Sequence, residues 1–515
     1  MAAKTFSGAA LVLMGMNTLA RLLGFVRETA VAAMFGASRY TDAYQVAYTI
    51  PYFLQMVLGV ALVSSVVPAM VRCIEDGREE EGWLAASITM NFTFLLMAAF
   101  AVAGVLGARL LVRWTAPGFD AETASVAQRM TALMFPSVLF MSVAMLITGI
   151  LNARRRFAVA AFAPAFASFV IIAGVLLFGA RSPDALPLAS LLSFVCMLLV
   201  QLPALRRIGF HYHFSFDRTN PVVRGVFRNL GAVFLGTATY QIYLAINRFF
   251  ASGLSAGSIS ALNFAGKLMN LPLGIFVAAV SVGIFPLLSA QALEADKREM
   301  WDTANRGLKL VLIFTLPAAA GLMALGQPIV RLLFERAAFT ADATVLTAGV
   351  LFWFGPGMGA MAATQVLTRA FYALTDTKTP LLFGLSSIAV NIGASIVLTP
   401  LMGAGGLALA NSLASLYYAV GMYIVLQHRF PQAGSRSLLQ TMAKVLVGSL
   451  ATAVAAIGVY RSVAPVLLHR GGLGQLITVG GAVCAGILGF LVVIFLLKEN
   501  ELFLFLRQLR GKQDQ

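Results

Sequence analysis

The residues best placed to do chemistry are charged side chains inside long apolar segments. The first such segment carries Arg21, Arg27 and Glu28 in the run ARLLGFVRE. A charge at the centre of a bilayer costs about 2.5–3.5 kcal/mol on insertion scales, so such residues usually face a cavity or a partner. A guanidinium binds phosphate through two parallel hydrogen bonds. The segment therefore predicts a polar cavity that binds an anion, lined by these three side chains.

The spacing of these charged residues determines which face of the helix each of them occupies. Arg21 and Glu28 are seven residues apart and share one helix face, whereas Arg27 lies about 120° away from Arg21. Gly24 between them lets a ligand or another backbone approach closely. The alternative is that Arg27 extends to the lipid headgroups. Arg21 lies deeper in the segment, and this alternative explains it less well.

Three further residues are candidates for the same cavity. Asp42 begins the second apolar helix, where an aspartate is either a binding residue or a helix cap. Arg248 and Lys267 add positive charge, and Lys267 lies about ten residues into its helix, too deep to reach the headgroups easily. Because the summed charge is positive, an anionic substrate fits better than a cationic drug.

Other kinds of site have little support in the sequence. The three cysteines are far apart and form no CxxC pair, which argues against a disulfide framework or a metal site. The four histidines all fall in predicted loops: His211, His213, His428 and His469. No GxxxxGK[ST] phosphate loop is present, so direct ATP hydrolysis is not expected. We predict no cofactor, and coupling to the membrane potential or to a monovalent cation.

Membrane helices must position these charges. Of 515 residues, 59% are apolar and only 11% are charged, whereas soluble domains are about 25% charged. This composition excludes a soluble enzyme, a disordered chain and a coiled coil. A membrane span needs about 20 apolar residues, which predicts an all-α integral membrane protein with about 14 transmembrane helices. We expect them at residues 8–34, 43–71, 84–112, 127–152, 157–179, 186–206, 226–251, 259–291, 306–328, 344–372, 379–400, 404–427, 438–462 and 474–498.

The net charge of +16 reflects orientation rather than nucleic-acid binding. Under these boundaries, the loops on the side of the N-terminus carry about 23 Lys and Arg and the opposite loops about 8, and the positive side is normally cytoplasmic. Both termini are therefore predicted to be cytoplasmic. The N-terminal run has no small-residue cleavage site before Arg21, so it is the first membrane helix rather than a signal peptide.

The chain also repeats itself at a nearly constant offset. Val112-Arg113 matches Val330-Arg331, and Pro136 matches Pro356, 220 residues later. Pro51 and Pro68 match Pro272 and Pro286 in the same way. Such an offset spans six helices, an even number, so both copies cross the membrane in the same direction and form a parallel repeat. This predicts an N-terminal lobe of six helices (1–215), a C-terminal lobe of six (216–430) and two extra helices with a tail (431–515), as in alternating-access transporters.

At several motifs the chain resembles the MurJ (MviN) family of lipid II flippases. The motifs are NTLARLLGFVRE at Asn17–Glu28, TDAY at Thr41–Tyr44, TAPGF at Thr115–Phe119, GILNA at Gly149–Ala153 and FYALTDTKTP at Phe371–Pro380. The resemblance implies the fold of the multidrug/oligosaccharidyl-lipid/polysaccharide exporter superfamily. It also implies flipping of undecaprenyl-pyrophosphate-linked disaccharide-pentapeptide from the inner to the outer leaflet of the bacterial inner membrane, without enzymatic chemistry. The family's cationic cavity corresponds here to Arg21, Arg27 and Asp42, and its last two helices form a groove for the lipid tail.

The chain departs from the family at several cavity positions. Many members carry arginine in helix 2 where this chain has Gln55 and Met56, and the helix 8 arginine aligns with Lys267. Many have an Asp-Arg pair in helix 7, with the aspartate proposed to bind sodium, where this chain has Asn247-Arg248. Gln55 is therefore included with the other candidate substrate-binding residues: Arg21, Arg27, Glu28, Asp42, Arg248 and Lys267.

These observations rank four functions. The leading hypothesis is a lipid II flippase whose partners are lipid II, membrane lipids and other cell-wall synthesis proteins. The missing helix 2 arginine leaves open an exporter of another lipid-linked oligosaccharide. A drug or cation antiporter would need more acidic cavity residues than Glu28. A membrane enzyme acting on polyprenyl lipids would need paired carboxylates or histidines at the interface, and the acidic loop at Glu75–Glu81 is more typical of a solvated surface.

Overall fold

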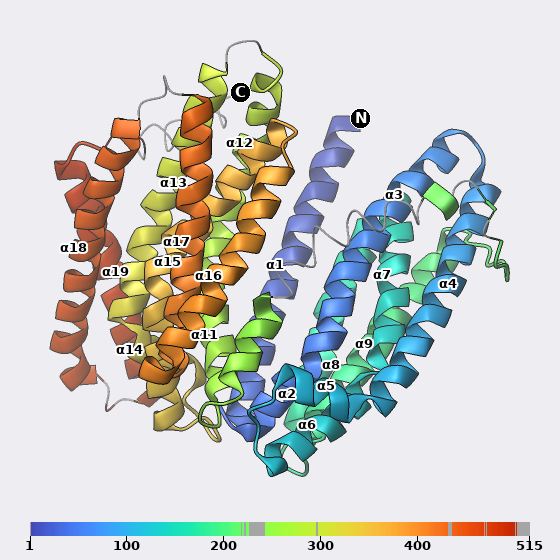
Figure 1. Cartoon of the computed structure of the whole chain (residues 1–515), viewed down its shortest axis with the longest axis horizontal. Coiled ribbons are helices and arrows are strands. Elements are labelled where there is room, and N and C mark those ends of the chain that lie inside the picture. Colours follow the sequence, from blue (N-terminus) through green and yellow to red (C-terminus); the bar gives the residue numbers. More distant parts are fainter. Residues whose placement is uncertain are drawn as a thin grey trace. The chain divides into compact units, whose positions relative to one another are not determined.

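The fold is known from a computed structural model of the whole chain (Figure 1). It describes residues 2–217, 219–220, 223–225, 243–294, 297–430, 435–467, 469, 471–499 and 501. Within these ranges the regular structure is helical throughout, with no strand. The prediction of an all-α membrane protein is therefore confirmed.

The chain packs as two compact units. The first comprises Met1–Ser260 and Arg336–Phe339, and the second comprises Ala261–Glu335 and Thr340–Gln515. The short stretch Arg336–Phe339 joins the first unit because its backbone meets the end of the first helix, where Ala338 donates an amide hydrogen bond to the Ala33 carbonyl over 2.9 Å. The lobe boundaries expected at 215 and 430 stay predictions.

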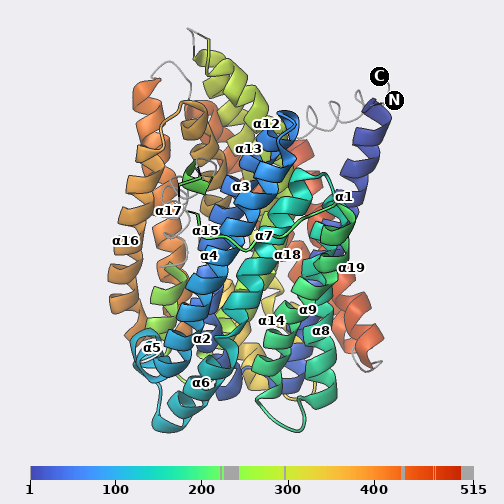
Figure 2. The ribbon, with the colours of Figure 1, turned by 90° about the vertical axis from the view of Figure 1, so that its right-hand side faces the viewer.

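The helices of the first unit pack around a core of Met, Leu, Ile and Val side chains. In the turned view of Figure 2, α8 lies beside both α1 and α9. The described helices are α1 (Ala2–Phe35), α2 (Arg39–Leu54), η1 (Gln55–Gly59), α3 (Val60–Glu75), α4 (Glu79–Leu106), α5 (Ala108–Thr115), α6 (Ala121–Met134), α7 (Ser137–Ala153), α8 (Phe157–Phe178), α9 (Ala185–Arg207) and the helical stretch 243–251.

The second unit is built around α15, whose neighbours include α13 and α17. Its helices are α11 (Ser258–Pro272, of which the first three residues belong to the first unit), η2 (Leu273–Val277), α12 (Ala278–Gln291), α13 (Arg298–Ala324), α14 (Gly326–Phe334), α15 (Ala341–Ala373), α16 (Lys378–Met402), α17 (Ala404–Arg429), α18 (Ser435–Leu467) and α19 (Gly471–Leu496). The last two run side by side (Figure 1).

Ten described helices are long and apolar enough to cross a membrane, or eleven when the bent pair α6 and α7 counts as one span. All eleven fall at positions where the sequence predicts a span. α1 covers the predicted span 8–34, and α11, η2 and α12 cover 259–291. Most of the span predicted at 226–251 lies outside the described residues. The predicted number of 14 is therefore matched in part.

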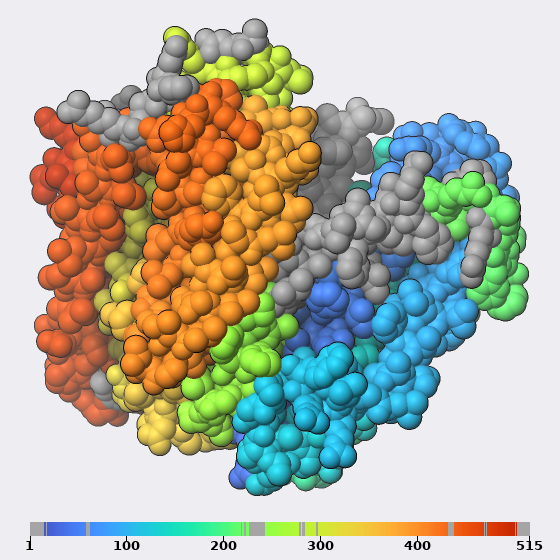
Figure 3. All heavy atoms as spheres, viewed as in Figure 1, coloured from blue at the N-terminus to red at the C-terminus, as the bar shows by residue number. Residues whose placement is uncertain are grey.

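The outer side chains of these helices suit a lipid environment. α16 lies on the face shown in Figure 3, where it exposes large apolar side chains to the surroundings. They are Leu381, Leu382, Leu385, Ile396, Val397 and Leu401. Because a soluble protein rarely exposes so large an apolar patch, this surface indicates contact with lipid tails.

The internal repeat is visible in the local structure of both units. α2 contains Pro51 and passes into the π-helical turn η1, while α11 ends at Pro272 and passes into η2. Proline cannot donate the helical hydrogen bond to the carbonyl four residues earlier, which favours such local widening. The short helices α5 and α14 correspond in the same way, and each is followed by a helix with a side-chain cap, Asp120 or Thr340. The shared features support duplication within the chain.

A polar strap follows α9 and lies along α4. In this strap, residues 209–217, the backbone carbonyls of His213 and Ser215 accept hydrogen bonds from the Asn91 amide over 3.4 and 2.9 Å. The Tyr212 hydroxyl donates to the Asn91 carbonyl oxygen over 2.5 Å. An extended backbone near a membrane must find such partners, because lipid offers none. Asn91 therefore holds the strap.

Replacing Asn91 with leucine should release the strap. The substitution suits an apolar helix but removes the donor of the two strap carbonyls, which belong to half-buried residues, and the acceptor of the exposed Tyr212 hydroxyl. We expect faster hydrogen exchange at residues 212–216, with exchange in the remainder of α4 unchanged. Ser87→Ala is the matched control, because it removes a single bond to the strap, the 3.1 Å bond from the His213 amide, together with the Ser87 bond to the Trp83 carbonyl inside α4. Equal hydrogen exchange at residues 212–216 in the Asn91→Leu and Ser87→Ala variants would contradict the role of Asn91 in holding the strap.

Candidate functional site

A tight corner between α1 and α2 positions the first candidate residues. Gly36 ends α1 with a φ of +66°, a conformation that glycine adopts readily. A Cβ atom at this position would lie only 2.3 Å from the Ala338 carbonyl oxygen. The Thr41 hydroxyl donates to the Gly36 carbonyl over 2.7 Å and fixes the start of α2. The corner therefore brings the last turns of α1 against the first turns of α2.

Arg27 and Glu28 form an ion pair on α1. An Arg27 guanidinium nitrogen lies 2.8 Å from Glu28 Oε1, and the side chains are 28% and 10% exposed. In so enclosed a place the pair is stable only because each charge has a partner. Glu28 therefore holds the Arg27 guanidinium in position and leaves part of its fork for a second anion. The Arg27–Glu28 ion pair thus joins two of the candidate substrate-binding residues by direct contact.

Three tyrosines on α2 stack beside this ion pair. The rings of Tyr44 and Tyr48 have centroids 5.9 Å apart, and those of Tyr48 and Tyr52 are 5.4 Å apart. The Tyr44 hydroxyl is hydrogen bonded to Ser190 of α9 over 2.9 Å, which anchors the stack. Arg27 is close enough to act electrostatically on all three phenols. The sequence signal for this stack is a tyrosine at every fourth position of an apolar helix, which our sequence analysis missed.

Arg248 reaches the same helix from the stretch 243–251. Its Nη1 donates to the Thr49 hydroxyl over 2.5 Å, and it also acts electrostatically on Tyr52. Gln55 begins η1 and is half-buried, and its enclosed side-chain oxygen has no hydrogen-bond partner among the described residues. The first unit thus brings Arg27, Glu28 and Arg248 to one stack of tyrosines.

Asp42 lies at the corner, with both carboxylate oxygens engaged. Oδ2 accepts the Gly257 amide over 2.6 Å, and Oδ1 accepts the Ser260 amide over 2.7 Å and also the Ser260 hydroxyl. The side chain is buried, at 3% exposure. The two amides lie immediately before and within the first turn of α11, so Asp42 caps that helix from outside. Both oxygens serve the protein's own backbone.

Lys267 lies in the second unit, exposed on α11. Asn270, one turn later, is also exposed, and its amide donates to the Gly266 carbonyl over 2.8 Å. Lys267 and Asn270 therefore belong to the second unit, whereas Arg21 and Arg27 belong to the first.

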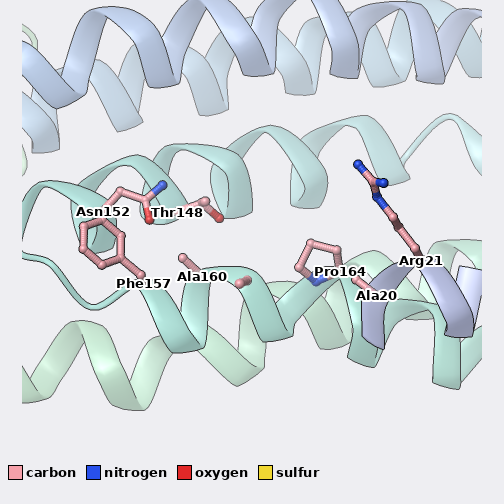
Figure 4. A pocket seen from close by; sticks show the side chains of 8 residues that line it. Ala20, Arg21, Thr148, Asn152, Phe157, Ala160 and Pro164 are labelled. Atoms are coloured by element: carbon pink, nitrogen blue, oxygen red, sulfur yellow. The ribbon is translucent and has the colours of Figure 1, made fainter. Parts of the chain in front are cut away.

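Arg21 lies apart from Arg27 and lines a separate pocket. This pocket, drawn in Figure 4, has a volume of about 560 Å³. Thr148 and Asn152 come from α7, Phe157, Ala160, Ala161 and Pro164 from α8, and Ala20 and Arg21 from α1. Its walls therefore combine one cation, one amide and one hydroxyl with an aromatic ring and three alanines. Arg21 and Asn152 lie toward opposite sides of the view in Figure 4.

The second unit contains a buried polar stripe that our sequence analysis also missed. Asn391, Ser395 and Thr399 follow one face of α16 at every fourth residue. Within the part of the chain that the structure describes, their side-chain polar atoms have no hydrogen-bond partner. Asn391 and Ser395 are 0% exposed. Buried polar groups are normally paired, so this stripe is suited to bound water or to a cation with neutral oxygen ligands.

Among the described residues, His, Cys, Asp and Glu side chains form no group of three or more suited to a metal ion. His211 and His213 instead lie 3.2 and 3.6 Å from the carboxylate of Glu80, on the exposed surface.

The sequence is similar to a known protein family and to curated members of it. The model of the family described as "Lipid II flippase MurJ" matches residues 31–502. A probable lipid II flippase MurJ of Rhizobium tropici is 32% identical over 516 residues, which cover 96% of this chain and 94% of the relative. The lipid II flippase MurJ of Burkholderia cenocepacia is 28% identical over 82% of this chain and 84% of its own.

Solved structures resemble the fold. A lipid II flippase MurJ in an inward closed conformation matches with a TM-score of 0.76 at 23% identity, over 94% of this chain and 98% of that chain. An inward-facing multidrug resistance MATE transporter of the MOP superfamily matches with a TM-score of 0.67 at 14% identity, over 82% and 98%. At these identities the similarity establishes the fold, which is the one that the sequence motifs imply.

Proposed function

Since the chain belongs to the MurJ family of lipid II flippases, we propose that it moves lipid II from the inner to the outer leaflet by alternating access. Family membership and its apolar helices identify it as a multi-pass protein of the bacterial inner membrane. It is a transporter and not an enzyme, because the family to which it belongs is one of lipid flippases. The distribution of Lys and Arg supports cytoplasmic termini.

One observation carries the assignment of the substrate: a guanidinium held by a carboxylate beside a stack of phenols. Arg27 is fixed by Glu28 at 2.8 Å and faces the tyrosines of α2. Its fixed fork suits the pyrophosphate of lipid II. Arg21 and Arg248 add to the positive charge of the first unit that attracts the headgroup, and Lys267 is proposed as a substrate-binding residue of the second unit. Neutralising this charge would let the protein close on the cytoplasmic side and then open outward.

Two features favour a second candidate function, the export of another lipid-linked oligosaccharide. Gln55 and Lys267 stand where many family members carry arginine, and Gln55 has an unpaired oxygen that could accept a sugar hydroxyl. A drug or cation antiporter fits less well, because the arginines of α1 outnumber Glu28.

The energy source is proposed to be the membrane potential or a monovalent cation. The neutral oxygens of Asn391 and Ser395 are suitable ligands for such a cation, since they are buried and unpaired. Flipping in vesicles with sodium, with potassium or with neither, each measured with and without an imposed potential, would test this. Equal rates under all conditions would exclude both sources.

The lipid tail is proposed to lie along α18 and α19, the two helices left over from the repeat. Both expose many large apolar side chains, among them Leu446, Leu450, Leu488 and Phe495. Membrane lipids contact the same surfaces, and other cell-wall synthesis proteins are further proposed partners. Crosslinking from these positions to the polyprenyl chain would test the assignment. Transfer of label to ordinary phospholipids alone would contradict it.

The function is tested by rescue of a depleted bacterium. A strain that loses its own lipid II flippase receives this gene, and lipid II in the outer leaflet is measured. We expect the unaltered chain to restore flipping. If a well-expressed chain fails to do so, the lipid II assignment is wrong, and the departures at Gln55 and Lys267 move another lipid-linked glycan to first place.

A further inference from the structure

The two arginines of α1 serve different surfaces. Six residues separate Arg21 from Arg27, which corresponds to about 9 Å along the helix and about 120° around it. Arg27 is paired with Glu28 beside the tyrosine stack, whereas Arg21 lines the pocket between α1, α7 and α8. One pyrophosphate therefore does not account well for both.

The pocket is large enough for part of a headgroup. Its volume of about 560 Å³ lies within the range of about 300–1,000 Å³ that is typical of ligand sites. Its size follows from the small side chains in its walls, Ala20, Ala160 and Ala161. Larger residues at these positions would fill the space between the helices, so the alanines keep the pocket open.

The polar groups of the pocket match a secondary amide. The Asn152 side chain offers two donors and an acceptor oxygen, and none of the other described residues forms a hydrogen bond to this side chain. The Thr148 hydroxyl proton is directed to the Ala144 carbonyl or to Gln201 Oε1, 2.9 and 3.0 Å away, which leaves its lone pairs to accept an N–H. Pro164 lacks the amide hydrogen that would otherwise bind the Ala160 carbonyl in the helix. The pocket therefore offers both hydrogen-bond donors and hydrogen-bond acceptors, which a secondary amide needs for its C=O and its N–H.

Arg21 adds a requirement for negative charge. A guanidinium pairs best with a carboxylate or phosphate, and it disfavours a cationic ligand. A bare phosphate would use the cation but not the amide and hydroxyl of α7. The combination fits an anionic group attached to one or more secondary amides.

We infer that this pocket binds the amide-bearing glycopeptide of the transported lipid, with an anionic group of that portion on Arg21. The inference rests on the proposed function and deepens it, because it divides the headgroup between two places: pyrophosphate at Arg27 and glycopeptide at Arg21, Thr148 and Asn152. The amides have two sources in such a headgroup, the peptide stem and the N-acetyl groups of the sugars. The pocket then determines specificity among polyprenyl lipids that share a pyrophosphate.

Binding of three probes to the purified full-length chain tests the inference. The probes are lipid II, the same lipid-linked disaccharide without its peptide, and undecaprenyl pyrophosphate alone. Ala161→Leu narrows the pocket, and Asn152→Leu removes its amide. We expect each to weaken lipid II binding about tenfold, equivalent to about 1.4 kcal/mol, and to leave undecaprenyl pyrophosphate within about twofold.

The matched control is Ala158→Leu. Ala158 lies on the same helix, is exposed and does not line the pocket, so the same substitution there should leave all three affinities unchanged. A loss of lipid II binding that the peptide-free probe shares supports the sugar amides as ligands, and a loss confined to lipid II supports the peptide.

Two outcomes would overturn the inference. One is an unchanged affinity for lipid II in both pocket variants, and the other is an equal loss for undecaprenyl pyrophosphate. Thermal unfolding of each variant is measured alongside, and Asn152→Gln replaces Asn152→Leu where the latter does not fold. If the unaltered chain binds none of the three probes, the proposed function itself fails, which is a different result from loss in the variants alone.

Discussion

Arg27→Ala abolishes lipid II flipping in the rescued bacterium when transport is compared at equal amounts of folded protein in the membrane; this is the largest effect we expect on transport. The guanidinium is 28% exposed and held by Glu28, so it is already positioned before the substrate arrives. Truncating one partner of a buried, hydrogen-bonded charge pair costs about 2–5 kcal/mol. Even the lower figure weakens headgroup binding at least about thirtyfold.

Two further variants separate the roles of charge and geometry at this pair. Arg27→Lys keeps the positive charge but loses the planar fork, so we expect partial transport. Glu28→Gln leaves the guanidinium without its buried counter-charge, and transport should fall because Arg27 is less well positioned. Binding of undecaprenyl pyrophosphate to the purified variants supplies the direct measurement. Near-normal flipping by folded Arg27→Ala would refute the assignment of this residue to the pyrophosphate.

Much of the fold follows from composition and periodicity. Long apolar runs bounded by charges predict membrane helices, since a bilayer leaves the backbone few alternatives. The duplication could also be predicted from the sequence, because prolines recur at matching positions, and both units contain a π-helical turn next to one of them. What the sequence did not reveal is the turn itself: proline marks a break in a helix, but neighbouring packing decides whether it bends or widens.

The candidate site could be predicted only as a set of residue types. Charges in apolar helices stand out because they are costly there, and this identified Arg21, Arg27 and Glu28. Their separation into an ion pair and a pocket depends on residues with no such signal: Ala160 and Ala161 matter for their small size, and Asn152 is a polar residue near a helix end. Tyr44 and Tyr48 are ordinary interfacial or core residues in sequence and acquire meaning only from Ser190 and Arg27 nearby.

Asp42→Ala is expected to cause the largest loss of stability. Three donors, the amides of Gly257 and Ser260 and the Ser260 hydroxyl, converge on its buried carboxylate. Hydrogen bonds to charged groups are worth about 1.5–3 kcal/mol each, and a buried donor left unpaired costs about 1–3 kcal/mol. We expect the free energy of unfolding to fall by roughly 3–5 kcal/mol, in line with other broken buried charges, measured by thermal or denaturant unfolding in detergent.

A graded series shows whether Asp42 acts as a cap. Ser260→Ala removes only the hydroxyl and should have a small effect. Asp42→Asn turns an amide donor toward the Gly257 or the Ser260 amide and should be intermediate. Asp120 is the matched control, because it also caps a helix but is exposed and accepts from its own first turn, so Asp120→Ala should be much milder than Asp42→Ala.

The same variants decide between the two roles that the sequence left open for Asp42. A cap acts on the folded state alone, so the folded fraction of Asp42→Ala should bind lipid II as tightly as the unaltered chain. A substrate ligand would give the opposite pattern, with unchanged unfolding and weakened binding. The geometry favours the cap, because both oxygens already serve the amides of residues 257 and 260, and a carboxylate would repel a pyrophosphate that approached it. Positive charge on α1 can then attract the headgroup without competition from Asp42, whose charge is taken up by the positive end of α11.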